Sequence, residues 1–108
     1  MQRKAFVMKI KPGVKEEYKR RHDNIWPEMR QMLHEAGLRN YSIWMFGEDT
    51  LFGYYETDDD DYAVQVQQNS EVARRWEAYM ADFLATYTLP DGTVMPVKDS
   101  LDLMFLQE

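Results

Sequence analysis

The 108-residue sequence contains no cysteine. Without thiols, the protein cannot form disulfides, attack a substrate through a thiolate, or hold zinc or an iron–sulfur cluster through sulfur ligands. Its two histidines, His22 and His34, have no nearby ligand pattern, which argues against a zinc site. Chemistry must therefore come from histidine, carboxylate or tyrosine side chains, or from a bound cofactor.

Long apolar runs and an excess of positive charge are also missing. No segment approaches the roughly 20 apolar residues that span a bilayer, and the N-terminal stretch MQRKAFVMKI lacks the features of a signal peptide. Thirteen basic and nineteen acidic residues give a net charge of −6 at pH 7. This balance argues against binding to nucleic acid or to membrane surfaces. We expect a cytoplasmic protein with neither kind of partner.

What the sequence does contain is enough apolar material for a packed core. Hydrophobic residues make up 44% of the chain and aromatic residues 14%. No internal repeat or linker is visible, and a chain of this length is typical of one domain. We therefore expect residues 1–108 to form a single domain.

Hydrophobic periodicity and turn residues predict the order of the secondary structure. We expect strands at 3–10, 41–46, 51–56 and 101–106, helices at 14–22, 29–36, 62–66 and 71–84, and an irregular surface segment at 86–100. Glu16 with Arg20 and Glu17 with Arg21 have the spacing of helix-stabilising ion pairs. The order predicts a ferredoxin-like βαββαβ fold, a four-stranded antiparallel sheet with its helices on one face.

The predicted strands are apolar on both faces, although helices can cover only one of them. The uncovered face would expose a larger apolar patch than soluble monomers usually tolerate. We therefore expect a homodimer that packs sheet against sheet, or a ligand cavity beneath a covering segment, or both.

The segment EEYKRRHDNIWPE, which begins at Glu16, places Tyr18, His22 and Trp26 four residues apart. Residues with this spacing share one face of a helix. Pro27 lacks an N–H and disfavours α conformation at the residue before it, so we expect a kink or a new helix between Asp23 and Trp26. Trp26 is then a structural residue, while Tyr18 and His22 stay on one helical turn.

His22 is the group best suited to move protons near neutral pH. A pocket of Tyr18, Tyr41 and Trp76 around it would suit a sugar, because aromatic rings pack against the C–H face of a sugar while polar groups bind its hydroxyls. The plain alternative is that Tyr41 and Trp76 belong to the core. The aspartates at 58–61 lack the alternating spacing of a calcium loop and indicate a solvated helix start. We expect no metal and no cofactor.

Several segments of the chain resemble the L-rhamnose mutarotase family of dimeric α+β barrel proteins, and the resemblance spans nearly the whole sequence. The matching segments are RKAFVMKI from Arg3, EEYKRRHDNIWPE from Glu16, the pair Asn40–Tyr41, Arg75–Trp76 followed by Tyr79–Met80, and the apolar C-terminal run. The resemblance implies that His22 is the acid/base residue. It also implies that Tyr18, Tyr41 and Trp76 contact the sugar.

One position departs from the family pattern. Glu77 occupies a place where family members carry a second tryptophan. A changed wall residue is a common way for a pocket to change its substrate, so the preferred deoxysugar becomes an open question.

The resemblance implies a homodimeric isomerase that interconverts the α and β anomers of L-rhamnose, or of a related deoxysugar, by opening and closing the sugar ring. In that reaction we expect His22 to donate a proton to the ring oxygen, with Tyr18 or a water taking the anomeric proton. Two alternatives stay open. Similar barrels include haem-degrading and cofactor-free monooxygenases, in the first of which His22 would be an axial ligand, and the chain could also be a sugar-binding dimer without turnover.

Overall fold

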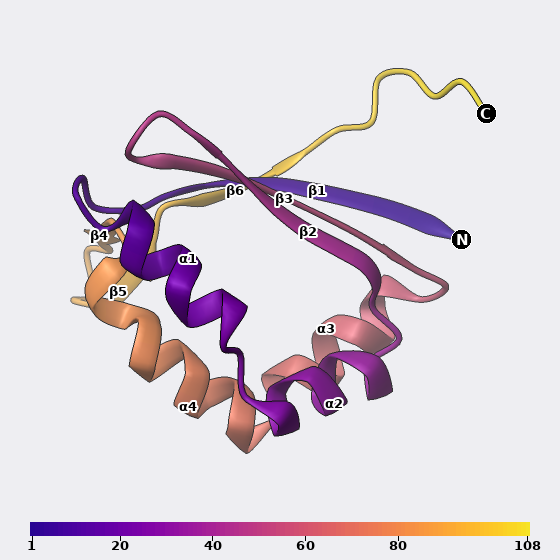
Figure 1. Ribbon diagram of the computed structural model, residues 1–108, viewed down its shortest axis with the longest axis horizontal. Helices are drawn as coiled ribbons and strands as arrows, with labels where there is room; N and C mark the ends of the chain where they lie inside the picture. The colour runs from indigo at the N-terminus through magenta and orange to yellow at the C-terminus, as the bar shows by residue number, and fades with distance from the viewer.

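The computed structural model describes all residues, 1–108, and contains both strands and helices (Figure 1). In chain order the elements are β1 (Gln2–Lys9), α1 (Lys15–Asp23), α2 (Pro27–Glu35), β2 (Arg39–Phe46), β3 (Thr50–Thr57), α3 (Asp60–Gln68), α4 (Glu71–Met80), the 3₁₀ turn η1 (Ala81–Phe83), β4 (Thr86–Thr88), β5 (Val94–Pro96) and β6 (Lys98–Leu101). No helix is both long enough and apolar enough to cross a bilayer.

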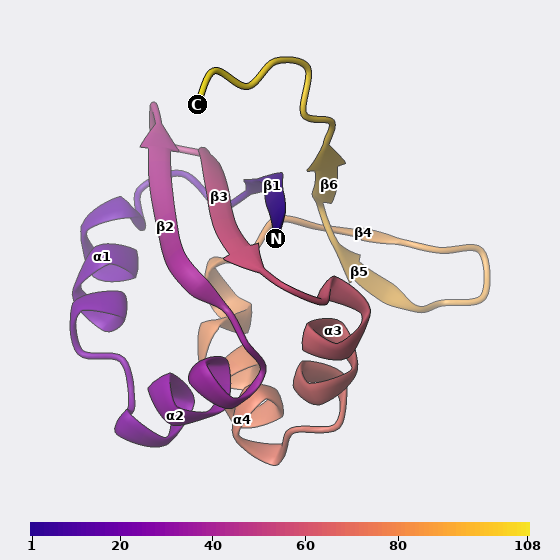
Figure 2. The same cartoon turned by 90° about the vertical axis from the view of Figure 1, so that its right-hand side faces the viewer.

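Four strands form one antiparallel sheet in the order β2-β3-β1-β6. All four helices lie on the same side of this sheet (Figures 1 and 2). This arrangement confirms the predicted ferredoxin-like α+β fold. The neighbouring strands β2 and β3 are joined by a short loop that contains Gly47, whose φ of 65° is readily adopted by glycine.

Helices α1 and α2 are separated at the place where Pro27 predicts a break. α1 ends at Asp23, and α2 begins with Pro27 in its first turn. Trp26 precedes it with an extended backbone, as the residue before a proline prefers. Glu17 pairs with Arg21 at 3.3 Å and also with Arg20, so the expected pairing of Arg20 with Glu16 is wrong.

The last two helices, α3 and α4, begin at side-chain caps, the first of them within the aspartates expected to start a helix. The Asp59 side chain accepts from the backbone N–H of Tyr62 at 3.1 Å, and the Ser70 hydroxyl accepts from that of Ala73 at 3.2 Å. α4 ends at Met80, before the predicted end at residue 84, because the chain tightens there into η1.

The C-terminal quarter differs from its prediction. The segment expected to be irregular contains a hairpin, β4 with β5, which projects from the body (Figure 2). The last strand is Lys98–Leu101 rather than 101–106, because β1 pairs with this segment through Ala5 to Met8 only. The chain beyond Leu101 has no regular structure, and its apolar side chains are exposed, with Met104 at 88%.

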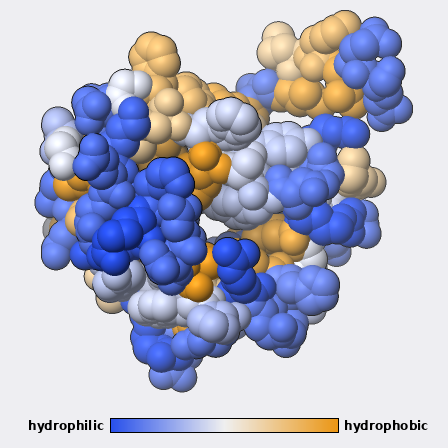
Figure 3. Space-filling model, in the orientation of Figure 1, coloured by the Kyte–Doolittle hydropathy of each residue, from blue (hydrophilic) through white to orange (hydrophobic).

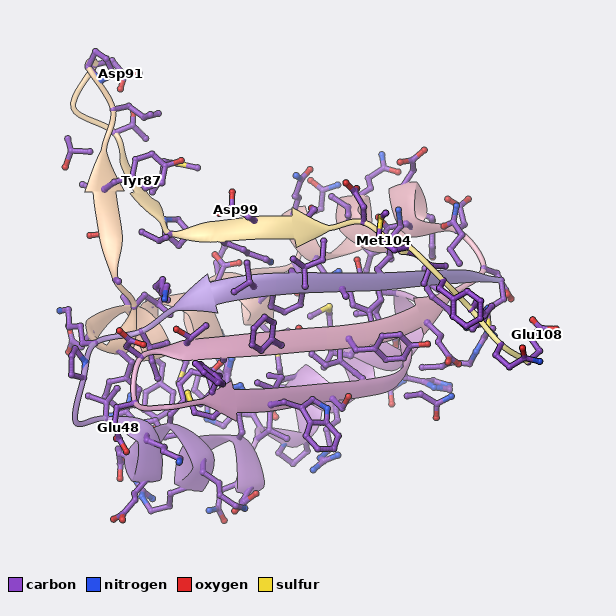
Figure 4. All side chains as sticks on the ribbon, turned by 90° about the horizontal axis from the view of Figure 1, so that it is seen from above. Glu48, Tyr87, Asp91, Asp99, Met104 and Glu108 are labelled. Carbon is purple, nitrogen blue, oxygen red and sulfur yellow. The ribbon has the colours of Figure 1, made fainter.

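The two faces of the sheet have different surroundings. The inner face, toward the helices, presents Phe6, Met8 and Leu51, the last of which is fully buried. The outer face has no helix over it (Figure 4). It exposes Trp44 and Phe46 at 68% and 71%. The expected apolar patch on the helix-free face is therefore present.

Candidate active site

A cavity of about 730 Å³ lies between the inner face of the sheet and the helices. In the space-filling view the molecule is hollowed near its centre, with hydrophobic atoms around the opening (Figure 3). Polar and apolar side chains share its walls, among them Phe6, Met8, Tyr18, His22, Tyr41, Trp76, Glu77 and Lys98. The four site residues predicted from the sequence thus line one cavity, whose size is typical of a small-molecule site.

His22 reaches the cavity from the last turn of α1. Its ring stacks on that of Tyr18 with centroids 4.4 Å apart and meets the Trp76 ring edge-on at 5.3 Å. Its Nδ1 atom lies 3.1 Å from the backbone oxygen of Tyr18. In the neutral imidazole this contact requires the proton on Nδ1, so Nε2 carries the free lone pair.

Burial sets the protonation state of this histidine. Removal from water lowers the pKa of His22 below its usual value of 6.5, and the Tyr18 carbonyl and the Asp23 charge oppose the shift only in part. The imidazole is therefore mainly neutral at pH 7. In that form Nε2 can accept a proton from a bound hydroxyl.

Tyr41 is brought to the cavity by an irregularity in β2. The pairing of β2 with β3 shifts between Arg39 and Ser42, and Asn40 adopts a positive φ of 51°, which asparagine tolerates. The Tyr41 ring then stacks on Tyr55 with centroids 5.5 Å apart. This stacking holds the phenol on the inner face of the sheet.

The two phenols in the cavity remain protonated near neutral pH. Burial raises the pKa of Tyr18 well above 10, and it raises the pKa of Tyr41 to about 12 although that residue is 40% exposed overall. Both hydroxyls therefore act as hydrogen-bonding groups rather than as bases. The alternative that Tyr18 takes the anomeric proton is disfavoured by this shift.

Contacts from Trp26 and Arg21 hold α1 and the segment after it against α4 behind the site. Trp26 meets the ring of Trp76 edge-on at 5.2 Å, consistent with the structural part expected for it. Arg21 lies over the ring of Tyr79 at 4.1 Å and donates to the Tyr79 carbonyl at 2.6 Å. Because Arg21 neighbours His22 in α1, these contacts fix the position of the imidazole relative to Trp76.

Sequence reasoning missed Phe6 and Lys98, which line the cavity on the side of the sheet and form its floor. Phe6 lies across Gly53, where a Cβ atom would collide with the phenyl ring. The Lys98 ammonium sits over the same ring, 4.4 Å from its centroid. Lys98 fell within the segment expected to be irregular. A β6 strand that starts at Lys98 would have placed this side chain on the inner face.

The charged residues do not gather into a metal site. Nowhere in the chain do three or more histidine, aspartate or glutamate side chains come close enough to hold a metal ion. Among the aspartates at 58–61, Asp59 instead caps α3, and Asp58 pairs with Arg39 at 3.0 Å.

The fold and cavity define the class of this protein. It is a ferredoxin-like α+β protein with a half-buried histidine in an aromatic-walled pocket. A family model described as L-rhamnose mutarotase matches residues 3–105. The chain belongs to the L-rhamnose mutarotase family, a family of isomerases.

Individual relatives agree with this assignment. The L-rhamnose mutarotase of Lachnoclostridium phytofermentans is 40% identical over 106 residues, which cover 97% of each chain. That of Burkholderia ambifaria is 45% identical over 103 residues, covering 94% of this chain and 93% of the relative. The crystal structure of an L-rhamnose mutarotase from Formosa agariphila matches with a TM-score of 0.82 and 35% identity over the full length of both chains.

A more distant match supports the fold alone. A dimeric ferredoxin-like protein from an uncultured marine organism has a TM-score of 0.55 at 14% identity, covering 97% of this chain and 96% of the other.

Proposed function

We propose that this protein interconverts the α and β anomers of L-rhamnose, or of a closely related deoxysugar, through His22. The observation that carries the proposal is the neutral imidazole inside the cavity, with Nδ1 engaged by the Tyr18 carbonyl and Nε2 free. Membership of the mutarotase family supports the substrate class.

Ring opening needs one proton removed and one delivered at adjacent atoms. The anomeric hydroxyl loses its proton as the bond between the anomeric carbon and the ring oxygen breaks, and the ring oxygen gains a proton. We assign the first transfer to Nε2 of His22, which becomes an imidazolium and then gives its proton to the ring oxygen. This adds a first step to the donation expected from the sequence.

The open-chain aldehyde then rotates about the bond from its carbonyl carbon to the next carbon. The same two transfers in reverse close the ring on the other face, and the imidazole returns to its neutral form. No redox change and no net proton uptake occur. Around the reacting atoms, Tyr18 and Tyr41 supply hydroxyls that can bind sugar oxygens, and Trp76 supplies an apolar wall.

The test is anomer exchange of L-rhamnose measured by saturation-difference NMR. Wild-type protein should accelerate exchange above buffer, and His22→Asn should lower the rate by about 10²-fold or more, the scale of general acid–base catalysis. His34→Asn is the matched control, because His34 is exposed on α2 and does not line the cavity. Absence of exchange with L-rhamnose, L-fucose and related sugars would contradict the proposal.

We also propose that two copies of this chain associate through the outer face of the sheet. Trp44 and Phe46 are the most exposed aromatic residues on this face, and the apolar residues beyond Leu101 extend the uncovered surface. Burial of these rings by a second sheet would remove from water the patch that the helices leave open. The distant fold match is itself described as dimeric.

A further inference from the structure

Lys98 is a charged residue that the proposed proton transfers leave without a role. In the β1–β6 pairing it lies opposite Met8, on the inner face of the sheet. Its ammonium group rests on the ring of Phe6 and borders the same cavity as His22. Lys98 therefore presents a cation to the space in which the sugar would bind.

This cation has no partner in the chain that would occupy its hydrogen bonds. None of the six ion pairs includes Lys98. Partial removal of the ammonium from water lowers the pKa of Lys98 although the residue as a whole is exposed, and the charge of Glu77 opposes that shift. The ammonium thus gives up part of its hydration for contact with an apolar ring, which a bound polar ligand would offset.

Glu77 is an exposed residue that borders the cavity from the helical side. It lies on α4, directly after Trp76, and borders the cavity together with Lys98. A carboxylate only accepts hydrogen bonds and an ammonium only donates them. Two neighbouring sugar hydroxyls offer both functions, so a diol can satisfy this pair.

We propose that Lys98 and Glu77 form a further substrate-binding subsite, in which Lys98 donates to one sugar hydroxyl and Glu77 accepts from its neighbour. The inference rests on the proposed function, since it concerns the same cavity. It also gives a chemical reason for the departure at Glu77, where an aromatic wall is replaced by an acceptor. Charge-assisted hydrogen bonds to hydroxyls are directional and therefore discriminate between sugar stereoisomers.

The primary test is calorimetric binding of L-rhamnose to wild type and to Lys98→Met. Methionine keeps an apolar stem over Phe6 but removes the donor. We expect the Kd to rise about tenfold, a scale set by the loss of a charge-assisted hydrogen bond. Lys98→Arg, which keeps a donor, should bind within about threefold of wild type. In the exchange assay, Lys98→Met should raise KM more than it lowers the rate at saturating sugar.

Deoxy analogues separate a direct contact from a structural effect. With 2-deoxy-, 3-deoxy- and 4-deoxy-L-rhamnose, one analogue should bind wild type and Lys98→Met equally, because it lacks the hydroxyl that Lys98 contacts. By the same reasoning, the analogue that lacks the hydroxyl contacted by Glu77 should bind wild type and Glu77→Gln equally. If Lys98→Met binds L-rhamnose as tightly as wild type, or loses the same factor for every analogue, the subsite is refuted.

The outcomes distinguish the inference from the proposed function. Sugar binding without anomer exchange would refute the mutarotase proposal but leave the Lys98 comparison intact. If Lys98→Met catalyses anomer exchange with the same KM as wild type, only the subsite is refuted. Wild-type protein that binds none of these sugars would refute both.

Discussion

The Nδ1 atom of His22 lies 3.1 Å from the backbone oxygen of Tyr18, one helical turn earlier in α1. The carbonyl accepts the Nδ1 proton, and the stacked ring of Tyr18 excludes water from one side of the imidazole. One residue thus both selects the tautomer and contributes to the burial that lowers the histidine pKa. The spacing of four residues that stood out in the sequence has a chemical consequence.

The pH dependence of anomer exchange should follow the neutral form of His22. Because burial lowers the pKa of His22 below 6.5, the rate should increase with pH and reach half its plateau below pH 6.5. Saturation-difference NMR from pH 5 to 8, corrected for exchange in buffer, measures this profile. A rate that decreases as pH rises over the same range would show that the imidazolium is the active form.

The same pKa shift should appear in the stability of the fold. A histidine whose pKa is lower in the folded state binds fewer protons there than in the unfolded chain. The free energy of unfolding should therefore decrease as pH falls below about 6.5 and stop changing, for this group, below the folded pKa of His22.

Urea denaturation at pH 7.5 and pH 5.0 measures that change. Between pH 7.5 and pH 5.0, the free energy of unfolding should fall less for His22→Asn than for wild type. The carboxylates are the same in both proteins, so the difference reports on His22. Equal losses in the two proteins would mean that His22 does not differ in pKa between the folded and unfolded states.

Gly53 should not tolerate a side chain, because the Phe6 ring of the cavity floor occupies the space where a Cβ atom would lie. Gly53→Ala places a methyl group against the Phe6 ring and forces the ring to move. We expect a loss of about 1–3 kcal/mol in the free energy of unfolding, the usual cost of overpacking, and weaker sugar binding. The double variant Gly53→Ala/Phe6→Leu should recover part of the stability, whereas an additive loss would contradict this explanation.

The outer face of the sheet should control association. Trp44 is 68% exposed, so Trp44→Arg should be tolerated by the isolated fold while it prevents burial of this face against a second sheet. Light scattering should then report a monomer where wild type is a dimer. Tyr62→Arg is the control, because Tyr62 is 51% exposed on α3, on the helical side of the molecule. A Trp44→Arg dimer as stable as wild type would place the interface elsewhere.

Local chemistry was enough to predict most element boundaries. Pro27 separates α1 from α2, and Asp59 begins α3 within the predicted aspartate run, because proline geometry and helix caps act over a few residues. The C-terminal prediction failed where pairing depends on distant strands. Whether β6 starts at Lys98 or at Leu101 is decided by its register with β1, about 90 residues earlier in the chain.

The sequence by itself determined the ferredoxin-like order of elements and the pair Tyr18 and His22 on one helical turn, since both follow from short-range periodicity. Only the tertiary structure decided which distant residues complete the cavity. Tyr41 arrives through a register shift in β2, Trp76 through the packing of α4 on α1, and Lys98 through the edge pairing of β6. These positions depend on long-range packing, because no local pattern specifies which side chains meet across a fold.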